Sequence, residues 1–300
     1  MHIRDATCDE AAILAPLTWG YYRPLLAMDD AARAELGAVC LAAWRDGRPL
    51  GLLISARHKD GGQNLLSLSV GRDHRRQGVG RALLRALVQA RPGPLCTQYS
   101  DRLPGADAFA ALLRAEGWAA PEAVSRRICG PVRETFSVFR QRAGLLERMC
   151  RQGFQVHAWG DRAAEILALA ERLLADGTAP AWADPRPWLD RLHPQASLAL
   201  VDAAGAVRGW VVCQHQPSMA RWYFPIGWVM EPEAGRGWLL GAYAEGARRL
   251  EETHGGDTRV VVESTSGLHA MWRVLDRHFS PHADWADHLM ESRRAYTNLH

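Results

Sequence analysis

Residues 65–90 read LLSLSVGRDHRRQGVGRALLRALVQA and decide the fold of this chain. In residues 65–70, leucine or valine alternates with serine, which is the period-two pattern of a half-buried strand. From Val79 to Ala90, apolar residues recur every three or four positions, which is the pattern of an amphipathic helix. The stretch therefore predicts a strand that passes through a short polar turn directly into a helix.

The turn between the two elements has the composition of an anion site. Gly78 and Gly80 lack Cβ atoms, so a ligand can approach the backbone and accept hydrogen bonds from the first helical turn. Arg75, Arg76 and Arg81 add positive charge, and charge-assisted hydrogen bonds contribute about 1.5–3 kcal/mol each. The alternative is a glycine-rich turn before a surface helix whose arginines are merely solvated.

The spacing in this turn resembles the coenzyme A motif of the GNAT acyltransferase superfamily. That motif is Arg or Gln, two residues, Gly, one residue, then Gly or Ala, and the chain has Arg75, Gly78 and Gly80 at these places. The resemblance implies that the strand end, the turn and the first helical turn bind the cofactor. The implied cofactor-binding residues are Leu68, Ser69, Val70, Arg75, Arg76, Gln77, Gly78, Val79, Gly80 and Arg81.

The elements on either side agree with this resemblance, which spans roughly residues 1–130. Asp46 and Gly47 predict a tight hairpin turn between two strands. The expected strands are residues 39–44, 50–57, 65–70, 95–99 and 123–129, with a further helix over 106–116. This last helix ends at Gly117-Trp118, which resembles the glycine and aromatic residue that close the family's final helix.

The second half of the chain repeats the element order of the first. Its expected strands are residues 197–201, 208–215, 222–230 and 260–263, with helices from 238 and over 268–279. A tandem duplication follows. The predicted fold class is α/β of the α+β type, with two GNAT-like domains that each have a mixed, mostly antiparallel sheet flanked by helices. The expected domains are residues 1–131 and 153–300, joined by a linker helix over 132–152.

The second copy has lost the phosphate motif. Depending on the register, Arg75 is replaced by Ala234 or Gly235, and Gly80 by Leu239 or Leu240. A leucine obstructs the approach of a pyrophosphate to the backbone. We therefore expect cofactor binding in the N-terminal domain only, the alternative being that Arg236 substitutes from another position.

The resemblance implies an N-acetyltransferase that moves an acetyl group from acetyl-CoA to an amine acceptor. It gives the Val70 N–H as the oxyanion donor. Many family members have a tyrosine four residues before the glycine of the closing helix, but this chain has Leu113 there. Tyr99, Ser100 or solvent is left to protonate the thiolate. The general base is open among four residues at or near strand ends, namely His58, Asp60, Tyr99 and Asp101.

Two groups of aromatic residues are candidates for acceptor contacts. Tyr21 and Tyr22 lie in the first helical region, where family members often bind the acceptor, and simple packing is the alternative. Five tryptophans of the second half either line an aromatic pocket or fill a core, namely Trp182, Trp188, Trp222, Trp228 and Trp238. Because no base is identified, a non-catalytic acyl-CoA binding or sensing protein is the alternative function.

Composition excludes several other classes. The formal net charge is +3 with dispersed arginines, which disfavours nucleic-acid binding. No apolar run reaches the roughly 18 residues that span a membrane, and no export signal begins the chain, so we expect a cytoplasmic protein. The six cysteines are scattered, and Pro281 separates His278 from His282, so no metal site is predicted. The expected partners are a small-molecule or peptide amine and, as a homodimer, a second copy of the chain.

Overall fold

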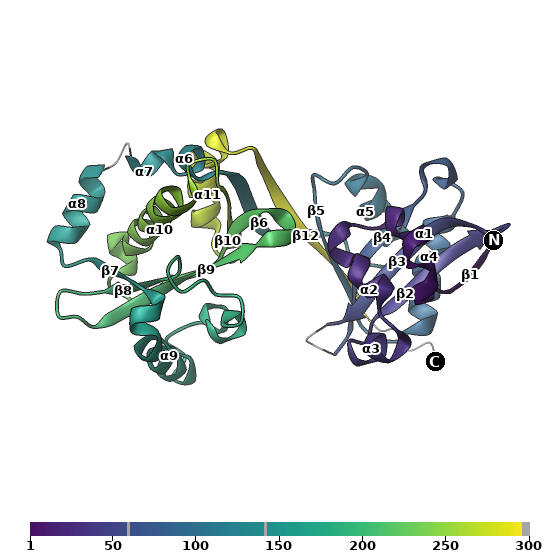
Figure 1. Ribbon diagram of the computed structural model, residues 1–300, viewed down its shortest axis with the longest axis horizontal. Helices are drawn as coiled ribbons and strands as arrows, with labels where there is room; N and C mark the ends of the chain where they lie inside the picture. Colours follow the sequence, from purple (N-terminus) through teal and green to yellow (C-terminus); the bar gives the residue numbers. More distant parts are fainter. Residues whose placement is uncertain (59–60, 141–142, 296–300) are drawn as a thin grey trace. The chain divides into compact units, whose positions relative to one another are not determined.

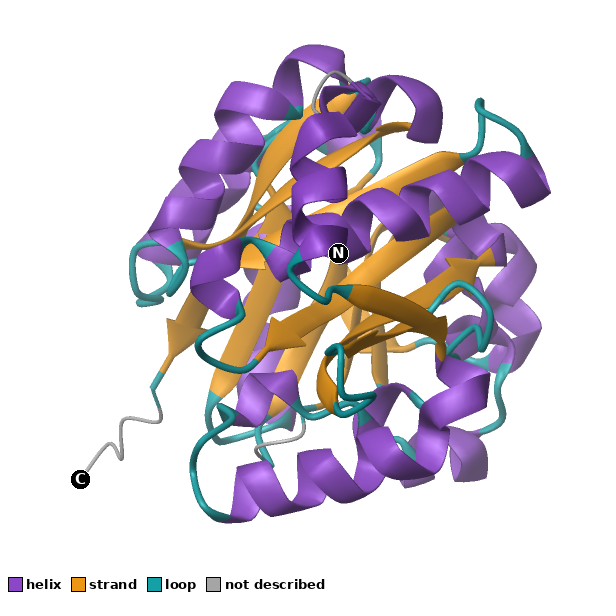
Figure 2. Ribbon diagram, turned by 90° about the vertical axis from the view of Figure 1, so that its left-hand side faces the viewer, coloured by secondary structure: helices purple, strands orange, loops and turns teal. Residues whose placement is uncertain are grey.

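The computed structural model describes residues 1–58, 61–140 and 143–295. The chain forms two compact units (Figure 1). The first unit comprises Met1–Val124 together with the chain from His288 onward, and the second comprises Ser125–Asp287. In each of them, strands lie between helices that cover both faces of a sheet (Figure 2).

The sheet of the first unit has the order β1-β2-β3-β4-β5-β12. Adjacent strands of this sheet are antiparallel, except that β4 and β5 are parallel. The strands are β1 (His2–Asp5), β2 (Val39–Arg45), β3 (Arg48–Arg57), β4 (Gln63–Val70), β5 (Leu95–Ser100) and β12 (Trp285–Arg294). The helices are α1 (Ala11–Leu14), α2 (Arg23–Ala27), α3 (Asp30–Glu35), α4 (Val79–Ala90) and α5 (Ala106–Ala115).

Apolar side chains cover both faces of this sheet. On one face, Leu83 and Leu87 of α4 and Leu113 of α5 are fully buried against alternate residues of β2 to β5. On the other face, Leu14 of α1 and Leu26 of α2 are buried against the intervening residues of β2 and β3. We call these the α4 face and the α1 face. The period-two alternation of the strands divides their side chains between the two faces.

The second unit repeats this arrangement with the strand order β7-β8-β9-β10-β11-β6. The strands are β6 (Glu122–Pro131), β7 (Gln155–Ala158), β8 (Leu198–Val201), β9 (Val207–Gln216), β10 (Arg221–Val229) and β11 (Arg259–Thr265). The helices are α6 (Val132–Thr135), α7 (Ser137–Arg140), α8 (Ala143–Arg151), α9 (Trp159–Ala175), α10 (Trp238–His254) and α11 (His269–His278). Strands β10 and β11 are parallel, as β4 and β5 are. The predicted duplication and mostly antiparallel sheets are confirmed.

Each half donates its last strand to the sheet of the other half. Residues 289–294 of β12 pair with β5 of the first unit, which Figure 1 shows as the yellow end of the chain beside β5. Residues 125–131 of β6 pair with β11 of the second unit. The two units therefore differ from the expected ranges 1–131 and 153–300, because both terminal strands cross over. Hydrogen bonding to a neighbouring edge decides where a strand belongs, and the edge that it joins lies far away in the sequence.

The segment expected as one linker helix, residues 132–152, contains three short helices, α6, α7 and α8. Val132, Phe136 and Met149 are buried in the core of the second unit. The segment is therefore part of that unit's core. Within the described residues, no helix is long and apolar enough to cross a membrane. The same residues contain no cluster of His, Cys, Asp and Glu suited to a metal ion.

Candidate active site

Strands β4 and β5 separate after a short paired stretch. Their parallel register joins residues 63, 64 and 65 to residues 95, 96 and 97, while β4 continues to Val70 beside β3. A bulge lies at the point of separation, because Ser67 is opposite Ile54 and Leu65 is opposite Ser55, which leaves Leu66 as an extra residue. A bulge bends its strand and ends regular pairing. The result is a gap between the carboxyl halves of β4 and β5.

The backbone of Val70 points into this gap. The next amide, Gly71 N–H, donates to Leu50 O of β3 at 2.8 Å. Because successive residues of a strand direct their N–H and C=O groups to opposite edges, the groups of Val70 face away from β3. The Val70 carbonyl accepts a hydrogen bond from Arg75 Nε at 3.2 Å. The Val70 N–H thus lies on the gap edge, the orientation that its predicted role as oxyanion donor requires.

The turn after the gap leads into the bare N-terminus of α4. Gly78 is the N-cap residue with φ +82°, and the first helical hydrogen bond runs from Ala82 N to Gly78 O at 3.0 Å. Among the described residues, no side chain caps this end. The earlier N–H groups of an α-helix have no partner within the helix, so they are available to an anion. Left-handed backbone suits glycine at position 78, which explains the residue type there.

The polar side chains of the motif are held partly by the protein itself. Arg75 bonds to Val70, and Gln77 Nε2 donates to Asp73 O at 3.0 Å. Arg81 forms an ion pair of 2.9 Å with Glu116, just past the end of α5. Sequence reasoning missed Glu116, because it lies near Arg81 only once α4 and α5 pack on the same face. Arg81 is therefore anchored beside the helix N-terminus.

The second unit has the same backbone geometry at the equivalent place. Residues 222–224 of β10 pair with residues 260–262 of β11, after which the pairing ends, and β10 has an extra residue between Tyr223 and Ile226. Helix α10 begins after Gly237, whose φ is +81°. Superposing the two registers aligns Gly237 with Gly78. Arg75 then corresponds to Ala234 and Gly80 to Leu239, the first of the two alignments considered from sequence.

Side chains of α10 pack closely on β10 at the corresponding place in the second unit. A Cβ atom added at Gly227, the counterpart of Leu68, would lie 2.8 Å from Leu239 Cδ1 and 2.9 Å from Tyr243 Cζ. Leu239 and Tyr243 of α10 therefore rest directly on the backbone of β10. At Gly80 an added Cβ would find only ordinary contacts, 3.5 Å to Leu112 and 3.6 Å to Val70. Tyr243 was missed by sequence reasoning, since its role appears only when helix and strand are packed.

The two candidate acids point to opposite faces of β5. Tyr99 is buried on the α4 face, in the same core as Leu113, and contacts Phe109 edge to face with ring centroids 4.9 Å apart. Burial raises the pKa of the Tyr99 phenol, so it retains its proton at neutral pH. Ser100 follows on the opposite side of the strand, and its Oγ accepts a hydrogen bond from Arg102 N at 3.2 Å. Of the two candidates, only Tyr99 lies on the same face of the sheet as Leu113, the position at which many family members have a tyrosine.

The residues considered as general base are spread over the first unit. Asp101 Oδ2 lies 3.1 Å from His288 Nδ1, so β12 brings a histidine to the end of β5 that sequence reasoning did not consider. His58 follows the end of β3. Asp60 lies outside the described residues.

The segment expected to contact the acceptor lies on the α1 face. Tyr21 is 57% exposed, whereas Tyr22 packs against the core formed by α1 and α2. Trp19, which sequence reasoning did not assign to the site, is 61% exposed. Thr18 Oγ1 donates to Ser67 Oγ of β4 at 3.1 Å, which fixes this segment over the gap strand.

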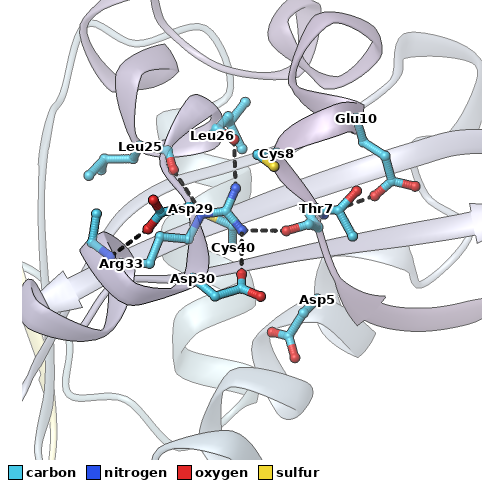
Figure 3. Close-up of polar contacts among 12 residues, drawn as sticks. Asp5, Thr7, Cys8, Glu10, Leu25, Leu26, Asp29, Asp30, Arg33 and Cys40 are labelled. Carbon is cyan, nitrogen blue, oxygen red and sulfur yellow. Dashed lines mark hydrogen bonds and ion pairs between the residues drawn. The ribbon is translucent and has the colours of Figure 1, made fainter.

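A buried arginine anchors the helices that follow this segment (Figure 3). Arg33 of α3 donates to Leu25 O at 3.0 Å and Leu26 O at 2.6 Å, the last carbonyls of α2, and also to Ala6 O. Asp29 caps α3 by accepting from Ala32 N at 2.8 Å. Carbonyl groups at a helix end lack partners within the helix, so this guanidinium satisfies them in the core. The acceptor-side segment is thereby held by a fixed support.

The tryptophans of the second unit belong mainly to cores. Trp222 and Trp238 are buried in one core and Trp228 in another, while Trp188 packs partly buried against the latter. Trp182 is 45% exposed. These residues do not line one common pocket, which favours the packing interpretation for four of the five.

Comparison with known families agrees with this geometry. Residues 9–93 match the family model described as the acetyltransferase (GNAT) family. This chain carries a GNAT domain. A search of curated proteins found no match.

Solved structures show the same tandem GNAT fold over nearly the whole chain. A tandem GNAT protein from the clavulanic acid biosynthesis pathway has a TM-score of 0.61 at 14% identity, with 100% of this chain and 99% of that chain covered. A GCN5-related N-acetyltransferase from Sphaerobacter thermophilus has a TM-score of 0.57 at 15% identity. The match covers 98% of this chain and 95% of that chain.

A third similar structure is a much longer protein. A fungal multi-domain GH3 beta-N-acetylglucosaminidase with a glucosamine N-acetyltransferase region has a TM-score of 0.65 at 14% identity. The match covers 97% of this chain but only 38% of that longer chain. These low identities establish the fold alone. The GNAT domain of this chain thus lies in a tandem GNAT architecture.

Proposed function

We propose that the protein is an N-acetyltransferase that transfers an acetyl group from acetyl-CoA to an amine, with the coenzyme bound only in the first unit. The observation that carries the proposal is the open gap between β4 and β5, which leads to the uncapped N-terminus of α4. Pantetheine fits beside the exposed strand edge, and the pyrophosphate takes the amides around Gly78 and Gly80. In the second unit Leu239 stands in the place of Gly80, and Tyr243 packs on Gly227, which supports binding in the first unit only.

Two steps of the transfer have a residue in this arrangement. The amine attacks the thioester carbonyl, and a tetrahedral oxyanion forms. Val70 N–H, on the gap edge, would donate to that oxyanion. When the C–S bond breaks, the thiolate takes a proton, and Tyr99 on the α4 face is the donor that we propose. The amine must lose a proton to a base or to water, a role that we assign to no single side chain.

A titration by calorimetry tests the cofactor site directly. We expect one equivalent of coenzyme A per chain, because only one of the two gaps is open. No binding, or two equivalents of equal affinity, would contradict the proposal. Release of free thiol from acetyl-CoA should then rise above the rate of hydrolysis when amines are added.

One observation favours a second function, that of a non-catalytic acyl-CoA binding protein. Leu113, where many family members have a tyrosine, is fully buried and cannot donate a proton. A binding protein would take up coenzyme A with the same stoichiometry but would release no thiol above background with any amine. The thiol assay therefore separates the two functions.

A further inference from the structure

The α1 face of the first unit carries a polar pair at the base of the gap. Gln98 is the first residue of β5 beyond its pairing with β4, and Glu291 of β12 lies opposite it in the antiparallel register. Gln98 Nε2 donates to Glu291 Oε2 at 2.7 Å. Tyr99 and Met290, their neighbours, pack into the core of the α4 face. Strand alternation therefore places Gln98 and Glu291 on the opposite face.

Other polar and aromatic side chains lie on the same face of the gap. Ser67 of β4 is joined to Thr18 by the hydrogen bond described above. Trp19 and Tyr21, which follow Thr18, are exposed. The α1 face therefore offers polar groups from β4, β5 and β12 below an exposed aromatic segment. Four parts of the chain contribute to it, namely the segment that begins at Thr18 and the strands β4, β5 and β12.

Glu291 is an ionised hydrogen-bond acceptor within this surface. Burial opposes its ionisation, but hydrogen bonds from Arg293 and Gln98 hold the pKa of the carboxyl below its ordinary value. Its side chain is 16% exposed, against 63% for Arg293, whose Nε lies 2.5 Å from Oε1. The positive charge of Arg293 balances the negative charge of Glu291. The surface therefore presents hydrogen-bond acceptors with little net negative charge. Each carboxylate oxygen can accept a second hydrogen bond.

The direction of attack assigns this surface to the acceptor. In the proposed function the coenzyme reaches the gap from the N-terminus of α4, on the α4 face. A nucleophile must reach the thioester carbonyl from a side that the pantetheine leaves open, which is the α1 face. An amine bound there would cover the acceptor atoms of Glu291, Gln98 and Ser67. Their remaining lone pairs then lose contact with water, which is unfavourable unless the amine supplies a second donor.

We propose that Glu291, with Gln98 and Ser67, forms the floor of the acceptor site and selects amines that carry a second hydrogen-bond donor. That donor is an N–H or an O–H a few bonds from the reacting amine. This inference rests on the proposed function for the position of the thioester. It adds a class of substrate and a specificity-determining residue that belongs to the last strand of the chain.

Three acceptors with the same three-carbon chain test the selection. Propylamine has no second donor, 3-aminopropan-1-ol has a hydroxyl, and 1,3-diaminopropane has a second ammonium. We expect kcat/KM for the latter two to exceed that of propylamine at least about tenfold, since a site built for hydrogen bonds discriminates against an analogue that lacks them. The difference between the amino alcohol and the diamine reports whether charge matters. Equal values for all three would overturn the proposal.

The variant Glu291→Gln keeps the shape of the side chain and removes its charge and one acceptor oxygen. We expect KM for the two donor-bearing amines to rise about tenfold, with kcat nearly unchanged and propylamine unaffected. Glu122→Gln is the matched control, because Glu122 is an exposed carboxylate at the start of β6. An equal effect of Glu291→Gln on all three acceptors would overturn the proposal. Unchanged affinity for coenzyme A verifies that the variant is folded.

A binding measurement separates this inference from the proposed function. Protein saturated with coenzyme A is titrated with 1,3-diaminopropane and with 3-aminopropan-1-ol in a calorimeter. Binding to the wild type that weakens about tenfold in Glu291→Gln supports the acceptor floor even if no acetyl transfer occurs. Absence of transfer to every amine contradicts the proposed function alone. Failure of both compounds to bind the wild type contradicts the acceptor floor.

Discussion

The two gaps of this protein share a backbone and differ in their side chains. Both have a short parallel pairing, a bulge and a left-handed glycine before the following helix, Gly78 in the first unit and Gly237 in the second. Leu239 stands in the place of Gly80, and Tyr243 packs on Gly227. The backbone of the turn is thus the same in both units, and the side chains around it are what distinguish them.

The largest effect is expected from copying the second unit into the first. Gly80→Leu places the side chain of Leu239 at the equivalent helix position, and we expect coenzyme A to bind at least about 100-fold more weakly, because the amides no longer reach the pyrophosphate. Calorimetry measures the change. Gly80→Ala is the control, since its Cβ would make only ordinary contacts of 3.5–3.6 Å. Wild-type affinity in Gly80→Leu would show that the two gaps differ for another reason.

A second difference lies on the parallel partner strands. Tyr99 corresponds in register to Ser264 of β11, so only the first unit has a phenol at this place. We expect Tyr99→Phe to lower kcat about 100-fold, because a positioned general acid typically contributes at least that factor. Affinity for coenzyme A should stay the same, since the ring still packs on Phe109. An unchanged kcat would remove Tyr99 from the mechanism and leave the proton to solvent.

A smaller effect is expected from Arg75, whose counterpart is Ala234. Arg75→Ala removes the hydrogen bond to Val70 O and one positive charge beside the pyrophosphate. We expect about tenfold weaker binding of coenzyme A, equivalent to about 1.4 kcal/mol, and a weaker dependence of the affinity on salt. Titrations at two ionic strengths measure both. Arg91→Ala, an exposed residue at the opposite end of α4, serves as the control and should leave both values unchanged.

The smallest effect is expected from the hydrogen bonds at the first helical turn of each half of the chain. In the first half Glu10 bonds to Arg4 and to Thr7 N, whereas helix α9 of the second half has no side-chain cap among the described residues. The hydrogen bond from Arg4 lowers the pKa of Glu10 to about 2. Its contribution to stability is therefore present above the unfolded value of about 4.3 and is lost as the pH falls towards 2.

The variant Glu10→Gln isolates that contribution. We expect it to lower the free energy of unfolding by less than about 1 kcal/mol at pH 7, because the pair is near the surface. The difference from the wild type should shrink between about pH 4.3 and pH 2. Urea unfolding across this range measures it. A difference that is constant with pH would mean that shape, and not charge, is what Glu10 contributes.

Much of the fold could be predicted because it depends on local patterns. The strand at Gln63–Val70, the helix at Val79–Ala90 and their repeats in the second half follow from alternation and helical spacing. The uncapped start of α4 at Gly78, which is the candidate anion site, could also be located from the sequence, since it depends on local backbone. Glu116, Tyr243 and Glu291 were not, because each meets its partner only after helices and strands from distant parts of the chain have packed.

The sequence by itself determined which segments form strands and helices, that they occur twice, and that only the first copy has both glycines of the turn. Local backbone preference and hydrophobic spacing act over a few residues, so they can be read along the chain. Only the tertiary structure decided which sheet receives β6 and β12. A strand edge offers its hydrogen bonds to any partner of suitable direction, and the choice depends on where the rest of the chain places that edge.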